Sequence, residues 1–94
     1  MTSIREFQEI MRKIYFERDN DRGVNRTFAW FKDEVKELEA ELQSKNKLAL
    51  ENEFADVLAW LSSLANLLNI DLEEVFDNTM LKINARDKDR TKNQ

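Results

Sequence analysis

The chain has 94 residues, of which 41% are hydrophobic and 36% are charged, and its formal net charge is −4. This length accommodates one small domain, and the acidic balance provides no basic field for nucleic acid or an anionic membrane. Because cysteine and histidine are absent, disulfides, Cys/His zinc sites, thiol nucleophiles and histidine-based catalytic pairs are excluded.

Helical periodicity runs through most of the chain. One glycine and no proline favour long helices over a many-stranded sheet. Apolar residues recur at helical spacing over about residues 4–17, 28–44, 48–68 and 72–86, so we expect four amphipathic helices. Together they predict an all-α fold, a single domain over residues 1–94 with a small four-helix bundle-like protomer.

Several helix ends carry local signals. Ser3 and Glu6 have capping-box spacing at the start of the first helix. Residues 19–25 are polar and contain the glycine, which predicts a loop, and Thr27 is then expected to cap the second helix. Asp71 is expected to cap the fourth helix.

The connections and the tail predict how the helices are arranged. A short polar turn at 44–47 makes the second and third helices antiparallel neighbours. The tail at 87–94 is expected to be solvated or frayed unless a ligand or partner orders it. A chain this short buries a modest core and would leave parts of several apolar stripes exposed, so we expect a homodimer or homotetramer.

No targeting or membrane segment is evident. The first residues, MTSIREFQE, are charged and do not form a signal peptide, and no apolar run approaches the ~20 residues that span a bilayer. We therefore expect a cytoplasmic protein with neither a membrane nor a nucleic-acid partner.

Two acidic motifs are the main functional signal. Glu34 and Glu37 are one helical turn apart, as are Glu53 and Asp56, and neither pair has a basic residue three or four positions away, where helical charges are usually paired. At ~100° per residue both pairs lie on the shoulder of an apolar stripe, so a hairpin can bring them together around a groove.

Carboxylates this close together repel one another, and the repulsion must be reduced. Two of them ~4 Å apart repel by roughly 4 kcal/mol at an effective dielectric near 20. A cross-helix Lys or Arg, protonation or a divalent ion would each reduce this repulsion, and a solvated acidic face is the alternative interpretation. Without histidine or cysteine the ion would be a hard one such as magnesium, manganese or calcium, and a ferritin-like di-iron site is excluded.

Other residues are weaker candidates. Lys82 and Arg86, one turn apart on the fourth helix, either complement the helix dipole or bind phosphate. Arg22, beside the glycine, either reaches phosphate from the loop or is solvated. Three aromatic residues either stack on a nucleobase or belong to the core or an interface: Phe16, Trp30 and Trp60.

The motifs resemble those of the MazG-like nucleotide pyrophosphohydrolases. The resemblance rests on residues 30–38 (WFKDEVKEL) and 53–61 (EFADVLAWL), together with the segments at 64–65, 70–73 and 82–86, and it covers about residues 15–90. It implies magnesium-dependent hydrolysis, with manganese as a possible substitute, of a nucleoside triphosphate. The substrate would be an NTP or dNTP, possibly a non-canonical one removed in a house-cleaning role, and the products the monophosphate and pyrophosphate.

The resemblance also implies site residues. Glu34, Glu37, Glu53 and Asp56 match the family's catalytic metal ligands. The phosphate-contacting basic residues of the family are matched by Lys82 and Arg86.

The chain departs from the family pattern at two positions beside these ligands. Lys36 stands where the family often has a small residue, and Asp33 stands where it often has Glu. Either change could alter the outer metal shell or a second metal position. Asp33 and Glu41 are candidates for the outer shell or the general base, and the sequence does not rank them.

Two other functions stay open. A phosphoribosyl-ATP pyrophosphohydrolase belongs to the same superfamily and is also small, all-α and acidic in its motifs. A non-enzymatic helical interaction module would use the apolar stripes for docking and the acidic ridges for solvation.

Overall fold

The computed structural model describes residues 2–92, which form four α-helices. These are α1 (Ile4–Arg22), α2 (Val24–Glu41), α3 (Lys47–Leu67) and α4 (Leu72–Lys92). Within this part of the chain there is no strand, and the all-α helical prediction is confirmed. None of the described helices is both long and apolar enough to cross a membrane.

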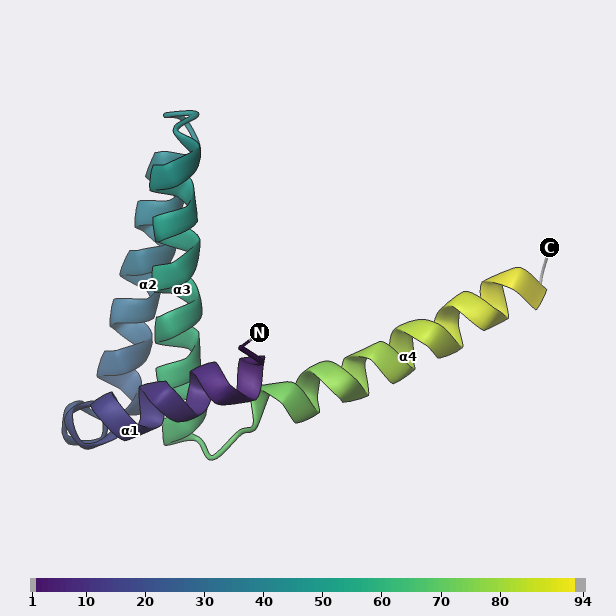
Figure 1. The fold of residues 1–94 in the computed structure, drawn as a ribbon, viewed down its shortest axis with the longest axis horizontal. Coiled ribbons are helices and arrows are strands. Elements are labelled where there is room, and N and C mark those ends of the chain that lie inside the picture. The colour runs from purple at the N-terminus through teal and green to yellow at the C-terminus, as the bar shows by residue number, and fades with distance from the viewer. Residues whose placement is uncertain (1, 93–94) are drawn as a thin grey trace.

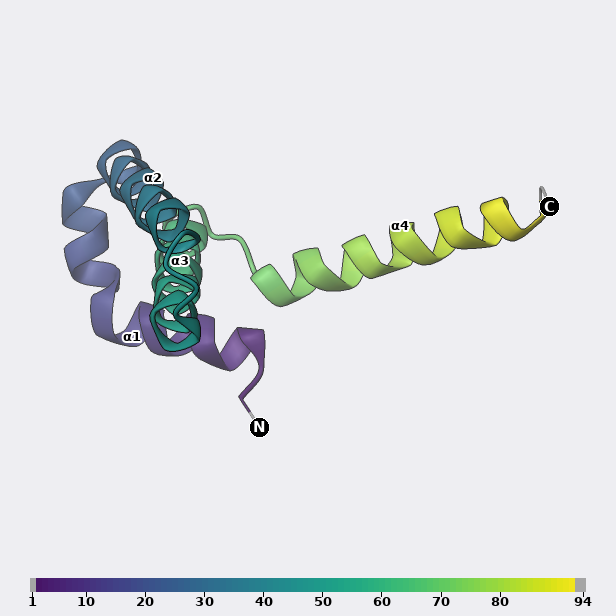
Figure 2. The ribbon, with the colours of Figure 1, turned by 90° about the horizontal axis from the view of Figure 1, so that it is seen from above.

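Helices α2 and α3 form a long antiparallel hairpin, side by side in both views (Figures 1 and 2). The connection turns through Lys45, whose φ is 58°. Asn46 then caps α3, because its side-chain oxygen accepts a hydrogen bond from the Ala49 N–H at 3.1 Å. This hairpin confirms the predicted antiparallel neighbours and fixes the two acidic motifs relative to each other.

Helix α1 crosses the base of the hairpin and packs mainly against α3 (Figure 1). The predicted loop at 19–25 is wrong, because α1 continues to Arg22 and α2 begins at Val24, so that Gly23 is the only break. Gly23 has φ 92° and ψ 163°, a conformation that essentially requires glycine.

Burial explains why these charged residues stay helical. Asp19 is 2% exposed, and its carboxylate accepts a hydrogen bond from the Arg22 guanidinium at 3.1 Å. The predicted Thr27 cap is also wrong. Thr27 lies inside α2, is fully buried, and its hydroxyl accepts a hydrogen bond from Arg22 at 3.4 Å.

Helix α4 leaves the hairpin and extends away from it in both views (Figures 1 and 2). Asp71 caps its start by accepting hydrogen bonds from the Glu73 and Glu74 N–H groups, at 3.0 and 3.4 Å. The helix continues to Lys92, beyond the predicted end at 86, so residues 87–92 are helical rather than frayed. The last two residues of the predicted tail, 93–94, lie outside the described residues.

A buried amide ties the start of α4 to α1. The Gln8 amide nitrogen donates to Asn66 Oδ1 at 2.9 Å and to the Ile70 carbonyl at 2.7 Å. Its oxygen accepts from the Leu72 N–H at 2.9 Å. Because Gln8 is 6% exposed, these bonds are shielded from water and hold the α3–α4 connection against α1.

The protomer by itself buries little apolar surface. Among the described residues, Ala65 is the only hydrophobic residue that is nearly fully buried, at 5% exposed. The accessible surface of the whole protomer is 7581 Å², whereas a compact monomer of the same mass exposes roughly 5,700 Å². The large apolar residues exposed on α4 are Val75, Phe76, Met80, Leu81 and Ile83.

Candidate metal centre

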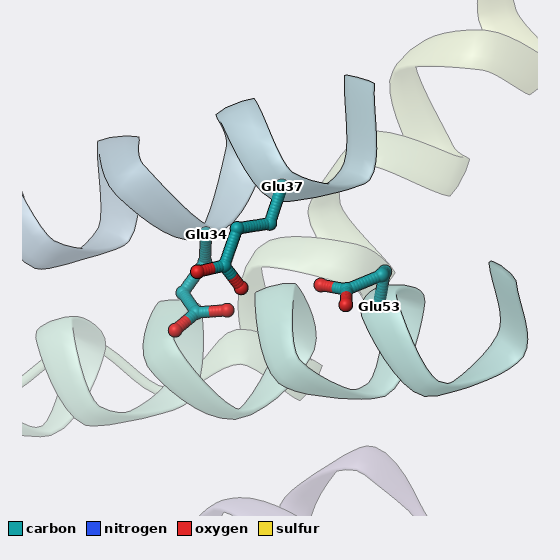
Figure 3. Close-up of side chains that lie close together, drawn as sticks. All are labelled: Glu34, Glu37 and Glu53. Carbon is teal, nitrogen blue, oxygen red and sulfur yellow. The ribbon is translucent and has the colours of Figure 1, made fainter. Parts of the chain in front are cut away.

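Three carboxylates lie close together between α2 and α3 (Figure 3). Glu34 and Glu37 come from α2, and Glu53 faces them from α3. One oxygen of each carboxylate lies within 4.8 Å of the others. The antiparallel hairpin thus brings together residues of the two acidic motifs that are separated by more than a dozen positions in the chain.

Two oxygens of this cluster are buried without a partner. Glu34 and Glu53 are partly buried, and the Oε2 atom of each is inaccessible and makes no hydrogen bond in the described structure. The ion pairs found among described side chains involve none of the cluster carboxylates. Among the described side chains, no Lys or Arg on the other helix relieves the repulsion, and burial of the unpaired oxygens is unfavourable.

Asp56, the fourth motif carboxylate, lies close to the cluster but outside the group within 4.8 Å. It is exposed, and its negative charge helps to raise the pKa of Glu34 and of Glu53.

The cluster holds protons more tightly than isolated carboxylates do. Burial is the main cause that raises the pKa of Glu34 to about 6, followed by the negative charge of Glu37 and a hydrogen bond shared with it, and then by the charges of Asp56 and Glu53. Burial also raises the pKa of Glu53, with further contributions from Glu37, Asp56 and Glu41. Once ionised, the cluster concentrates negative charge on oxygen donors alone, which suits a hard divalent cation.

The model of the MazG nucleotide pyrophosphohydrolase domain matches residues 22–91, a segment that includes both acidic motifs. The chain belongs to the MazG family. This membership confirms the resemblance seen in the motifs.

Part of this MazG domain is also similar in sequence to a bacterial protein. The chain is 55% identical over 42 residues to the "Uncharacterized protein YpjD" of Bacillus subtilis (strain 168). The match covers 45% of this chain and 38% of that protein.

Arg22 occupies a different environment from the loop position that the sequence predicted. Its side chain is 8% exposed and pairs with Asp19. Its guanidinium lies 4.2 Å from the ring centre of Trp30 and 5.0 Å from that of Trp60, and the two rings meet edge-on at 5.4 Å. These contacts make Arg22 a bridge between α1 and the hairpin of the MazG domain, and its Nη1 atom bonds to Asp19 and Thr27.

The other residues predicted to bind substrate differ in where they lie relative to the acidic cluster. Lys82 and Arg86 belong to α4, which points away from the hairpin, so one protomer does not bring them to the acidic cluster (Figure 1). Phe16 contacts the guanidinium of Arg12, at 5.1 Å from its ring centre. Trp60 follows Asp56 by one turn of α3 and is partly buried.

Glu41 is a neighbour of the cluster. Its negative charge contributes to the raised pKa of Glu53, and its Oε2 accepts a hydrogen bond from the Ser44 hydroxyl at 2.7 Å. Asp33 and Lys36 are exposed on α2. Spacing along α2 did not rank Glu41 above Asp33, because each lies four residues from Glu37.

Proposed function

We propose that this MazG domain hydrolyses a nucleoside triphosphate, an NTP or dNTP that can be non-canonical, to the monophosphate and pyrophosphate. The main observation behind the proposal is that Glu34 and Glu37 face Glu53 across the hairpin. Two buried oxygens of this cluster have no hydrogen-bond partner. In a chain of this family, that arrangement supports a cation-dependent hydrolase rather than a solvated acidic face.

The proposed cation is Mg²⁺, for which Mn²⁺ can substitute. The donor set fits, because Mg²⁺ prefers carboxylate oxygen and keeps positions for water and substrate phosphate. Glu34, Glu37, Glu53 and Asp56 would hold it. When bound, the ion would neutralise triphosphate charge and lower the pKa of a coordinated water.

The reaction needs a proton acceptor, and the structure favours Glu41 over Asp33. Glu41 lies close enough to Glu53 to affect its pKa, and Ser44 orients its carboxylate. We assign Glu41 to accept the proton as water attacks the α-phosphorus. The bond from that phosphorus to the bridging oxygen then breaks, and pyrophosphate leaves with the electron pair.

The proposed assembly is a homo-oligomer, a dimer or tetramer, in which a second copy completes the site. The protomer exposes roughly 1,900 Å² more than a compact monomer of its mass, which exceeds the ≈ 800 Å² per partner of a standard interface. Helix α4 carries exposed apolar residues together with Lys82 and Arg86. We propose that these two cations contact the substrate phosphates bound to another copy, with Trp60 beside the base.

The substrate panel that tests this function contains the common NTPs and dNTPs, a deaminated and an oxidised dNTP, and phosphoribosyl-ATP. Pyrophosphate and inorganic phosphate are measured separately, with and without Mg²⁺. Wild type should release pyrophosphate only with the cation, and Glu53→Gln should lose at least about 100-fold in kcat/KM, corresponding to about 2.7 kcal/mol.

The matched control is Glu39→Gln, which removes an exposed carboxylate of α2 outside the cluster and should keep its activity. Selective turnover of phosphoribosyl-ATP would establish the histidine-synthesis alternative. If no substrate releases pyrophosphate and wild type behaves like Glu53→Gln, the enzyme proposal is wrong, and the non-enzymatic interaction module is the remaining hypothesis. A cytoplasmic location follows from the proposed nucleotide substrate and is part of the same proposal.

A further inference from the structure

The start of α4 is fastened to α1 by side chains that do not belong to the acidic cluster. Among the described helices, α4 packs mainly against α1, and beyond this joint it runs away from the α2–α3 hairpin (Figures 1 and 2). The direction of the helix therefore depends on the bonds made at its first turn.

Gln8 makes the buried part of this joint. Leu72 is the first residue of α4, so its N–H is one of the helix donors that have no partner within the helix. Gln8 Oε1 accepts from this N–H at 2.9 Å, while Gln8 Nε2 donates to Asn66 Oδ1 and to the Ile70 carbonyl. In return, Asn66 Nδ2 donates to the Gln8 carbonyl at 3.1 Å. One residue thus joins α1, the end of α3, the connection and the first residue of α4.

Arg5 makes a second attachment on the exposed side of the joint. Its guanidinium pairs with Asp71 at 3.0 Å and with Glu73 at 2.8 Å. Glu73 also accepts from the Arg5 backbone N–H at 3.4 Å. Arg5 and Gln8 are neighbours on α1, three residues apart. Because they hold different atoms of the same turn, they oppose a change in the angle of α4 as well as its separation from α1.

The length of α4 amplifies any change at this joint. Lys82 and Arg86 are 10 and 14 residues beyond Leu72, or roughly 15 and 21 Å along the axis at the rise of an α-helix. A tilt of about 10° at the first turn would therefore move these two cations by roughly 3 and 4 Å. A charge-assisted hydrogen bond does not survive such a displacement.

We propose that Gln8, supported by Arg5, is a positioning residue for the substrate triphosphate. The two side chains set the direction of α4 so that Lys82 and Arg86 reach phosphates held at the acidic cluster of a second copy. The inference rests on the proposed function for this contact. Gln8 touches neither the substrate nor the cation, and it acts only through the angle at which α4 leaves the joint.

The first measurement follows the direction of α4 itself. The chain contains no cysteine, so Glu39→Cys on α2 and Asn78→Cys on α4, both at exposed positions, provide a spin-label pair without background sites. Labelled chain is diluted with unlabelled chain, and double electron–electron resonance then reports the distance within one copy. Gln8→Leu, which removes the amide and keeps a side chain of similar size, should broaden the distance distribution. Arg5→Gln should broaden it less.

The second measurement shows whether Gln8 acts through the two cations. Affinity is measured by calorimetry with Mg²⁺ and the α,β-methylene analogues of ATP, GTP, CTP and UTP. Gln8→Leu should weaken the analogue that binds best by about tenfold or more, as expected for loss of charged phosphate contacts. In a Lys82→Gln/Arg86→Gln background the same substitution should change affinity less than about twofold, because the contacts it controls are already gone.

Two controls separate positioning from a general loss of structure. Ser62→Ala removes another buried polar group, one that bonds to the backbone of its own helix, and it should change neither the distance distribution nor the affinity. Gln8→Leu should keep the Mn²⁺ affinity of the acidic cluster, because α2 and α3 hold those carboxylates. If Gln8→Leu does not fold, Arg5→Gln, whose side chain is 48% exposed in wild type, carries both measurements.

Two results would overturn the proposal. One is a distance distribution that stays the same in Gln8→Leu and Arg5→Gln. The other is an equal loss of analogue affinity with and without Lys82 and Arg86, because Gln8 would then support the fold in general.

Failure of the proposed function gives a different result. If no triphosphate is hydrolysed but analogue binding depends on Gln8 only while Lys82 and Arg86 are present, the positioning role stands and the assigned reaction falls. If hydrolysis proceeds and Gln8→Leu changes neither KM nor analogue affinity, the reaction stands and the positioning role falls.

Discussion

Removal of one charge from the acidic cluster should stabilise the protein in the absence of cation. Glu34→Gln keeps the size of the side chain and abolishes its negative charge. Two charges at 4.8 Å, the upper limit of the separation between the cluster oxygens, repel by ~0.9 kcal/mol in water and ~3.5 kcal/mol at an effective dielectric of 20. The substitution therefore relieves repulsion from Glu37 and Glu53, where loss of a typical surface charge would change stability little.

The raised pKa of Glu34 gives the magnitude and the pH window. A rise from 4.5 to about 6 corresponds to about 2 kcal/mol, or about 1 kcal/mol after discounting for solvent screening. Below pH 4.5 Glu34 is protonated in both the folded and unfolded states, so the wild type carries no penalty. As pH rises through 6 the folded state must ionise it, and stability is lost by this amount.

The assay is thermal unfolding at one fixed protein concentration, without divalent cation, at pH 4.5 and pH 8. Glu34→Gln should raise Tm by about 4–8 °C at pH 8 and leave it nearly unchanged at pH 4.5. Glu39→Gln, exposed on the same helix, should show no such pH-dependent gain. A Glu34→Gln protein that is less stable than wild type at pH 8, or equally stabilised at both pH values, would refute the electrostatic reasoning.

Three other predictions follow from the site and its supports. The apparent affinity for Mn²⁺ should fall about tenfold per pH unit below pH 6, as protons compete for Glu34, and equal dissociation constants at pH 5 and 8 would contradict this. Asp19→Ala should cost about 3–5 kcal/mol in urea unfolding, because Arg22 is left buried and unpaired, whereas Asp21→Ala at an exposed position should be nearly neutral. Gly23→Ala should cost about 1–3 kcal/mol through backbone strain alone, since nothing lies within 4 Å of the added Cβ; unchanged stability would show that the helix break relaxes.

The acidic centre was predictable from sequence because its signal is local. Missing basic neighbours at i±3 and i±4 and a short polar turn suffice to place two carboxylate pairs on facing shoulders of a hairpin. Which carboxylates come closest was not predictable. The helix rotation brings Glu34, Glu37 and Glu53 together and leaves Asp56 outside this group, a difference set by packing of the two helices.

The errors in the predicted fold also have tertiary causes. Charged residues around Gly23 have the composition of a loop, yet burial of Asp19 with Arg22 keeps them helical. The direction of α4 depends on a Gln8 amide more than 60 positions away, so no local pattern specifies it.

Binding of a divalent cation to the facing carboxylates is the central claim, and Mn²⁺ titration monitored by electron paramagnetic resonance tests it most directly. The experiment compares wild type, Glu53→Gln and Glu39→Gln at pH 8, with and without a non-hydrolysable triphosphate analogue. Wild type and Glu39→Gln should bind Mn²⁺ with equal affinity, and Glu53→Gln should bind it about 10–100-fold more weakly, because removal of a buried ionic partner costs several kcal/mol in total but is partly offset by relieved repulsion. Equal Mn²⁺ affinity in all three proteins would contradict the claim.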